Sequence, residues 1–153
     1  MKKLLCMVLC AMLVLSLAAC GKPQVKEVDL AAEEVAVIES SGEVLFPEEN
    51  PEVIESLYPG LTAVETKQLV VYLPPIVGFP CEIVMVEAAA EDDTEAICVI
   101  LQNRIDAAAD DTTYPENAEG WKNRAEVWRN GPFVVMTALP ENIERTDAMK
   151  AEF

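Results

Sequence analysis

The chain has 153 residues, of which 27 are acidic, 11 are basic and none is histidine, so its formal net charge is −16. This charge disfavours nucleic acid as a partner, and the absence of histidine excludes Ser-His-Asp and Cys-His catalysis together with the usual zinc sites. The acidic residues are spread along the chain without a block of five or six like charges. This pattern favours solubility over a dedicated surface for cations or basic partners.

The first nineteen residues have the order of a bacterial lipoprotein signal. Lys2 and Lys3 precede an apolar run from Leu4 to Ala19, and small residues stand just before Cys20. The run is shorter than the roughly 20 residues that a stable membrane-spanning helix needs. We therefore predict that residues 1–19 are cleaved off and that Cys20 becomes the first residue. Its lipid would anchor the protein on the extracytoplasmic face of the cell membrane.

Cleavage after residue 19 leaves 134 residues with nine basic and 27 acidic side chains, a formal net charge of −18. This length suits one domain with a single core. We predict a lipidated N-terminus and tether over residues 20–28 and a single extracytoplasmic domain over residues 29–153. Anionic headgroups repel so acidic a body, so the lipid on Cys20 is the expected attachment to the membrane.

Two short helices are predicted first in the domain. Apolar residues recur at helical spacing from Val28 to Ile38, through Ala31 and Val35, and Gly42 is placed to end that helix in a left-handed cap. Asn50-Pro51 then combines an N-cap residue with proline at the first helical position, and Pro59-Gly60 ends the second helix.

Two strands and a longer helix follow. The β-prone runs Leu69–Leu73 and Cys81–Val86 are separated by a loop rich in proline and glycine. Asp92 and Glu95 have the spacing of a capping box at the start of a helix. The predicted apolar face of that helix consists of Ile97, Ile100, Leu101, Ile105 and Ala108.

The last third of the chain predicts a helix, a hairpin and a final helix. Tyr114-Pro115 opens a helix that places Ala118, Trp121 and Ala125 on one side. Asn130-Gly131 then indicates a tight hairpin turn in which both residues have positive φ, and a final helix is predicted over residues 141–153. The elements predict an α+β fold with a small, mainly antiparallel sheet of about four strands, in two hairpins, packed with helices.

Several short motifs across residues 60 to 140, together with the lipidation signal, carry a family resemblance. They are Glu82–Glu87 running into an acidic helix start, Arg104, Tyr114-Pro115, Asn123–Val127, and Gly131 followed by Phe133-Val134. With these motifs the chain resembles the bacterial lipoproteins catalogued as domain of unknown function family 4358. The resemblance implies a clostridia-like, Gram-positive source and an exported lipoprotein. It supplies no activity and no catalytic residues.

Two cysteines remain once the signal is removed and Cys20 is lipidated. An exported protein can form a disulfide between Cys81 and Cys98, but two buried thiols agree equally well with their positions on a strand and beside a helix stripe. Neither has a histidine partner that would make it a nucleophile.

Two acidic clusters are candidates for chemistry. Residues 91–95 lack the spacing and the glycine of an EF-hand, and helix capping explains them without a metal. Asp110-Asp111 with Glu116 and Glu119 offers paired carboxylates, which are what glycoside hydrolysis requires. No other motif supports an enzyme, and we predict no metal and no cofactor.

The aromatic residues provide the candidate binding surface. Tyr114, Trp121, Trp128 and Arg129 could together contact a protein or glycan, although core packing is expected for two of the three aromatic residues. Trp128 beside Arg129 is the leading candidate for a binding hot spot if it faces solvent. The sequence thus favours a non-enzymatic binding or assembly module at the cell envelope. The alternative is an envelope hydrolase that uses paired carboxylates, with or without a divalent cation.

Overall fold

The computed structural model describes residues 27–33, 38, 43–76 and 78–139. The signal segment, Cys20, Gly42 and the helix predicted over residues 141–153 lie outside these ranges, so those predictions stay as they were made.

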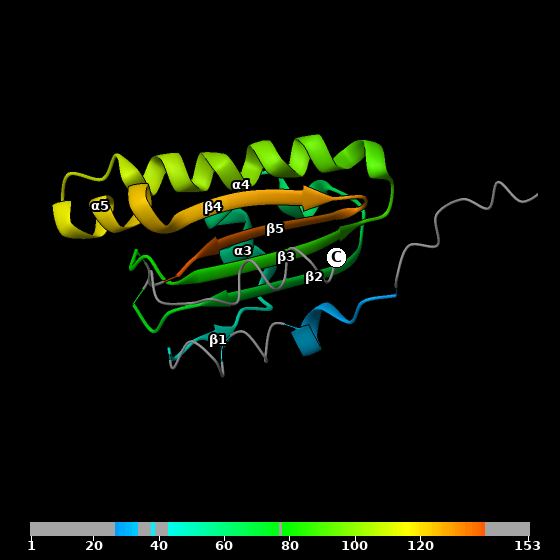
Figure 1. Cartoon of the computed structure of the whole chain (residues 1–153), viewed down its shortest axis with the longest axis horizontal. Coiled ribbons are helices and arrows are strands. Elements are labelled where there is room, and N and C mark those ends of the chain that lie inside the picture. Colours follow the sequence, from blue (N-terminus) through cyan, green and yellow to red (C-terminus); the bar gives the residue numbers. More distant parts are fainter. Residues whose placement is uncertain (1–26, 34–37, 39–42, 77, 140–153) are drawn as a thin grey trace, which may run out of the picture.

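A five-stranded antiparallel sheet forms the centre of the domain (Figure 1). Its strands are β1 (Phe46–Pro47), β2 (Thr66–Leu73), β3 (Glu82–Ala88), β4 (Ala125–Asn130) and β5 (Phe133–Ala138), in the spatial order β1-β2-β3-β5-β4. The predicted α+β class is confirmed, with the β2–β3 and β4–β5 hairpins joined through the β3–β5 pair. Strand β1 is additional, because two residues carry no alternation by which a strand could be recognised.

Alternation along the central strand sorts its side chains onto two covered faces. Val84 and Val86 point to one face, and Ile83 and Met85 point to the other; all four are fully buried. Successive residues of a strand face opposite sides, and both sides of this strand need apolar cover. The domain therefore has a layer of chain on each face of its sheet.

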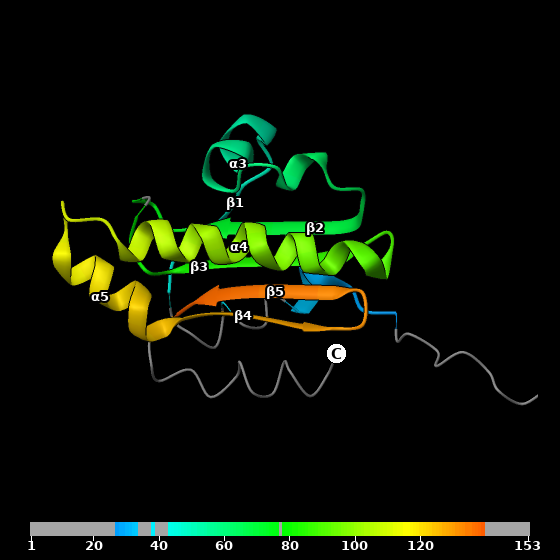
Figure 2. The ribbon, with the colours of Figure 1, turned by 90° about the horizontal axis from the view of Figure 1, so that it is seen from above.

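Helices cover the Val84 face. They are α3 (Pro51–Leu57), α4 (Thr94–Ala109) and α5 (Pro115–Arg124), with the short 3-10 turns η2 (Leu61–Ala63) and η3 (Glu91–Asp93). Helix α4 runs along the strands, and Figure 2 shows α3 and α5 on either side of it. The expected face of α4 is confirmed at four positions, since Ile97, Leu101, Ile105 and Ala108 are buried.

The helix starts agree in part with the capping patterns. The Asn50 side chain accepts a hydrogen bond from the Glu52 amide at 3.0 Å, with Pro51 at the first turn, as expected. Helix α4, however, starts at Thr94 after the 3-10 turn, and its cap residue Asp93 makes no side-chain bond. The predicted cap at Asp92 was wrong because the local turn takes up residues 91–93 and the Thr94 hydroxyl bonds back to the Glu91 carbonyl at 2.8 Å.

The other face of the sheet is covered by the N-terminal segment. The Leu30 amide donates to Oε1 of Gln68 at 3.1 Å, and Nε2 of Gln68 donates to the Val28 carbonyl at 2.8 Å. Val28 and Leu30 are buried, whereas Ala31, expected on the apolar face, is exposed. Among the described residues, packing against the sheet therefore begins at Val28, next to the start of β2.

The β4–β5 turn differs from its predicted form by one residue. Asn130 pairs with Phe133, so the two-residue loop is Gly131-Pro132. Gly131 has φ of +53°, and no described residue other than glycine has a positive φ. Because proline fixes φ near −65°, a turn with two positive φ angles is excluded, and a type II′ turn with glycine first fits the loop. The expected positive φ at Asn130 was therefore wrong.

A buried ion pair joins the sheet to the helices. Glu82, at the start of β3, is fully buried, and both of its carboxylate oxygens accept hydrogen bonds from the Arg104 guanidinium of α4, one of them from Nε at 3.1 Å. The hydroxyl of Tyr58, just after α3, donates to Oε2 of Glu82 at 2.8 Å. One carboxylate thus fixes β3, α4 and the end of α3 to one another.

The surroundings change the titration of this group. Burial, followed by the negative charge of Glu82, raises the pKa of Tyr58 well above its ordinary value. Burial alone would lower the pKa of Arg104, but the hydrogen bonds and charge of Glu82 outweigh it and raise that pKa. Arg104 and Tyr58 therefore keep their protons at neutral pH and remain hydrogen-bond donors to Glu82.

Removing one member of this buried ion pair should lower the free energy of unfolding far more than removing one member of an exposed ion pair. We expect Glu82→Gln to lower the free energy of unfolding by about 3–5 kcal/mol, because it leaves a buried guanidinium without its counter-charge. The control is Glu95→Gln, the same change of residue in the exposed 2.7 Å pair with Arg129, which should cost at most about 1 kcal/mol. Urea unfolding at pH 7 measures both. Equal losses in the two variants would contradict the role given to Glu82.

Candidate functional site

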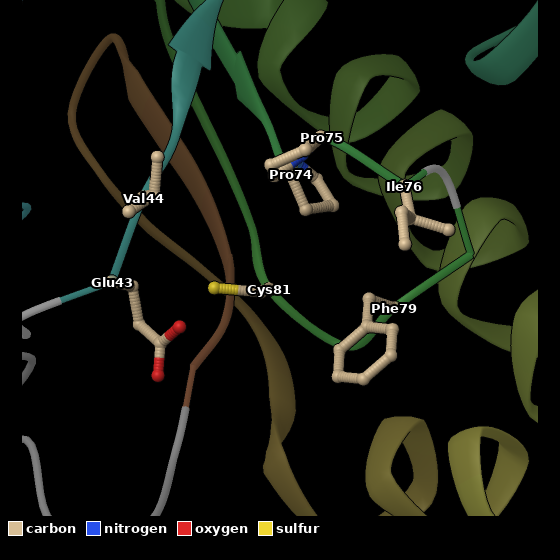
Figure 3. A pocket seen from close by; sticks show the side chains of 7 residues that line it. All are labelled: Glu43, Val44, Pro74, Pro75, Ile76, Phe79 and Cys81. Carbon is tan, nitrogen blue, oxygen red and sulfur yellow. The ribbon is translucent and has the colours of Figure 1, made fainter.

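An apolar pocket lies at the end of the sheet where the β2–β3 loop leaves it. Its volume is about 300 Å³, near the lower end for small-molecule sites. It is lined by Glu43, Val44, Pro74, Pro75, Ile76, Phe79 and Cys81. Figure 3 shows two walls, one from the β2–β3 loop and the other from the segment before β1, with the Cys81 sulfur pointing toward that segment.

Exposed apolar side chains gather around this pocket. Six large hydrophobic residues are exposed in the described part of the chain; Val44, Ile76 and Phe79 line the pocket, and Phe46 follows Val44 by two residues. Single exposed hydrophobic residues are normal, but a cluster around a concavity indicates a contact surface. This cluster is the strongest candidate functional site in the described part of the chain.

The loop that forms one wall has restricted backbone freedom. Pro74 and Pro75 fix two consecutive φ angles. The Phe79 amide donates to the Ile76 carbonyl at 3.4 Å, and the Cys81 amide donates to the Phe79 carbonyl at 2.8 Å. A wall held in this way loses little conformational entropy when a ligand binds.

Helix α5 packs against the same loop and donates a hydrogen bond to it. The indole Nε1 of Trp121 donates to the Gly78 carbonyl at 3.1 Å, and the guanidinium of Arg104 lies 4.9 Å from the centre of the Trp121 ring. Gly120 lies against Pro80 so closely that a Cβ there would be 2.6 Å from the proline ring. The pocket wall is therefore connected, through Trp121 and Arg104, to the buried carboxylate of Glu82.

Cys81 is the only thiol among the described residues lining the pocket, and its surroundings suppress its reactivity. Burial, then the charge and hydrogen bond of Glu43 and the charge of Glu82, raise the pKa of the Cys81 thiol to about 12. The thiolate is the reactive form of cysteine. At neutral pH this thiol stays protonated, and the pocket is therefore suited to binding rather than to thiol catalysis.

This suppression predicts slow alkylation. At pH 8 we expect Cys81 to react with iodoacetamide about 100- to 1,000-fold more slowly in the native protein than in guanidinium, because a rise of three pKa units lowers the thiolate fraction about a thousandfold. The folded protein also favours the protonated thiol of Cys81 over the thiolate. Ionisation of this thiol therefore leaves the free energy of unfolding unchanged below pH 9 and lowers it as the pH rises from about 9 toward 12. Mass spectrometry of the Cys81 peptide follows the reaction. Equal rates in the two states would show that the thiol is not protected.

The second cysteine lies elsewhere. Both Cys81 and Cys98 are free thiols, and they pack against apolar clusters on opposite faces of the sheet. A disulfide requires Cα atoms within about 7 Å, which an intervening sheet does not allow. Of the two alternatives left by the sequence, the structure favours free thiols. Burial is the main cause that raises the pKa of Cys98.

The four residues of the predicted binding surface are not brought together. Trp121 is fully buried in the helical layer, Tyr114 is exposed at the start of α5, and Trp128 packs partly buried on the opposite face of the sheet. Arg129 faces α4 and pairs with Glu95 at 2.7 Å. Trp128 and Arg129 are neighbours on one strand, so their side chains point to opposite faces. The pocket was missed because its walls come from segments about thirty residues apart in sequence.

The acidic clusters have structural partners. Arg129 lies among residues 91–95, where it bonds Glu95 and approaches the Thr94 hydroxyl at 3.5 Å. Asp110, Asp111, Glu116 and Glu119 are all exposed, and the Thr113 backbone amide lowers the pKa of Asp111, opposite to the shift that a general acid needs. Within the described ranges, no group of three or more potential ligands is placed to hold a metal ion.

Comparisons with known protein families, with curated proteins and with solved structures find no match for the chain. The resemblance stated from the sequence motifs therefore stays a prediction. In the described part of the chain, no helix has the length and apolar character needed to cross a membrane.

Proposed function

We propose that this protein is a lipid-anchored, extracytoplasmic binding module that holds its partner through the apolar pocket between the β2–β3 loop and the segment before β1. The observation that carries this proposal is the cluster of Val44, Ile76 and Phe79 around a concavity whose loop wall is fixed by hydrogen bonds. Exposed apolar side chains are tolerated at such a site because binding covers them.

The chemistry of the pocket supports binding over turnover. Its lining offers one carboxylate, one protonated thiol and otherwise apolar side chains. The buried Tyr58–Glu82–Arg104 group is satisfied internally, and both Tyr58 and Glu82 are fully buried, so a substrate has no access to that carboxylate. No observation favours the hydrolase alternative.

The location rests on the sequence of residues 1–20. Cys20→Ala should prevent lipid attachment and the cleavage that depends on it, so that an uncleaved precursor accumulates. Fractionation of cells, with metabolic labelling by a palmitate analogue, measures both effects. A Cys20→Ala protein that is still processed and stays membrane-bound through a high-salt wash would contradict this anchor.

The binding role predicts a local effect of apolar truncation. Phe79→Ser should weaken the binding of an environment-sensitive apolar dye about three- to tenfold, because partial burial of a phenyl ring contributes about 1 kcal/mol. Val99→Ser is the matched control, since Phe79 and Val99 are each 52% exposed and Val99 lies on α4, outside the pocket.

Dye fluorescence and thermal melting are measured together for both variants. We expect melting temperatures close to that of the parent protein, because both substituted side chains are exposed. Equal dye binding by the Phe79→Ser and Val99→Ser variants would show that the pocket is not the binding site.

A further inference from the structure

We propose that the ligand of this pocket is a basic peptide segment of an extracytoplasmic protein, which inserts one bulky apolar side chain and places a lysine or arginine beside Glu43. This inference rests on the proposed binding function and specifies its ligand. Three observations support it: the shape of the lining, the charge of the carboxylate, and the position of the pocket at the far end of β2 from the described start of the chain.

The apolar lining sets the first requirement on the ligand. A volume of about 300 Å³ corresponds to about ten water molecules, which suits a single large side chain with part of its backbone. The wall side chains are a valine, an isoleucine, a phenylalanine and two prolines. Such a wall contributes apolar contact without hydrogen-bond donors, so it selects a phenylalanine, leucine or similar anchor rather than a sugar ring with many hydroxyl groups.

The charge at the pocket sets the second requirement. Glu43 is exposed, and it is the one acidic residue among the described residues that line the pocket. It accepts a hydrogen bond from the Cys81 thiol, and its negative charge attracts a cation that is placed beside it. With 27 acidic residues against 11 basic ones in the chain, the surrounding field also attracts cations and repels anionic lipids or fatty acids.

The position of the pocket distinguishes a protein ligand from the membrane. The described N-terminal segment joins the sheet at Gln68, near the start of β2, whereas the pocket follows the opposite end of β2 after Leu73. The pocket therefore lies at the opposite end of β2 from the described start of the chain. A membrane that lies against the N-terminal end of the domain leaves the pocket open to a protein ligand.

The test uses the mature lipoprotein in zwitterionic phosphatidylcholine nanodiscs, to which basic peptides have little electrostatic attraction. Four capped heptapeptides on a glycine–serine background are titrated. Three contain a central phenylalanine flanked by two lysines, two glutamines or two glutamates, and the fourth is the lysine peptide with alanine in place of phenylalanine. We expect the lysine peptide to bind about two- to fivefold tighter than the glutamine peptide, the glutamate peptide to bind weakest, and the alanine peptide to lose most of its affinity.

Two protein variants separate the pocket carboxylate from the general charge. Glu43→Gln should lower the ratio of lysine-peptide to glutamine-peptide affinity toward one, leaving only the part that the general charge of the chain contributes. Glu49→Gln, which removes the same charge from an exposed residue outside the pocket, should leave the ratio unchanged. Melting temperatures verify that both variants are folded.

The outcomes separate the two proposals. Equal affinities for the lysine and glutamine peptides, or the same effect from Glu43→Gln and Glu49→Gln, would overturn the inference of a basic ligand. If in addition the apolar dye still distinguished the Phe79→Ser variant from the Val99→Ser variant, the proposed binding function would stand. If no peptide bound while the dye did, the ligand would not be a peptide of this class. If neither bound in the pocket, the proposed function itself would fail.

Discussion

A carboxylate that leaves water must find positive charge and hydrogen-bond donors, and the architecture of this domain is built around that requirement at Glu82. The guanidinium of Arg104 and the hydroxyl of Tyr58 satisfy it, so β3, α4 and the end of α3 must meet at one point. Trp121 lies against the same guanidinium and donates a hydrogen bond from its indole nitrogen to the β2–β3 loop at Gly78. The proposed binding surface thus rests on a buried polar group, and the hydrogen bond from Trp121 connects the loop to that group.

Local signals in the sequence predicted the class of fold and most of the elements. The helix start at Asn50-Pro51, the two hairpins and the apolar face of α4 each depend on residues within a few positions of one another, where propensity and periodicity act directly. The turn after β4 lies one residue later than the Asn-Gly pattern predicts. Across an Asn130-Gly131 loop Arg129 would face Pro132, which has no amide hydrogen to donate, and the strands instead close at Asn130 and Phe133.

The site could not be predicted to the same extent, because it depends on contacts between distant segments. A pocket formed by residues 43–44 and 74–81 produces no periodic pattern in the sequence. The two tryptophans lie on opposite faces of the sheet, which no local pattern predicts. One signal was available. Glu82 precedes Val84 by two positions and Val86 by four, so on a strand its side chain lies on the same face as theirs. Arg104 follows Leu101 by three positions and so lies on the apolar stripe of α4. A charged residue in each of two core-facing patterns indicates a buried pair.

The strand order also determines how the chain must be assembled. Synthesis produces β2 and β3 early, but the neighbour that completes β3 is β5, which is made only after α4 and α5. Until then β3 is an open edge with four consecutive apolar residues, Ile83–Val86, the kind of edge that pairs with other chains. The β4–β5 hairpin closes this edge by a non-local contact, which is the slow kind of step in folding. The danger of aggregation is therefore concentrated in incomplete chains rather than in the finished domain, whose central strand is enclosed on both sides.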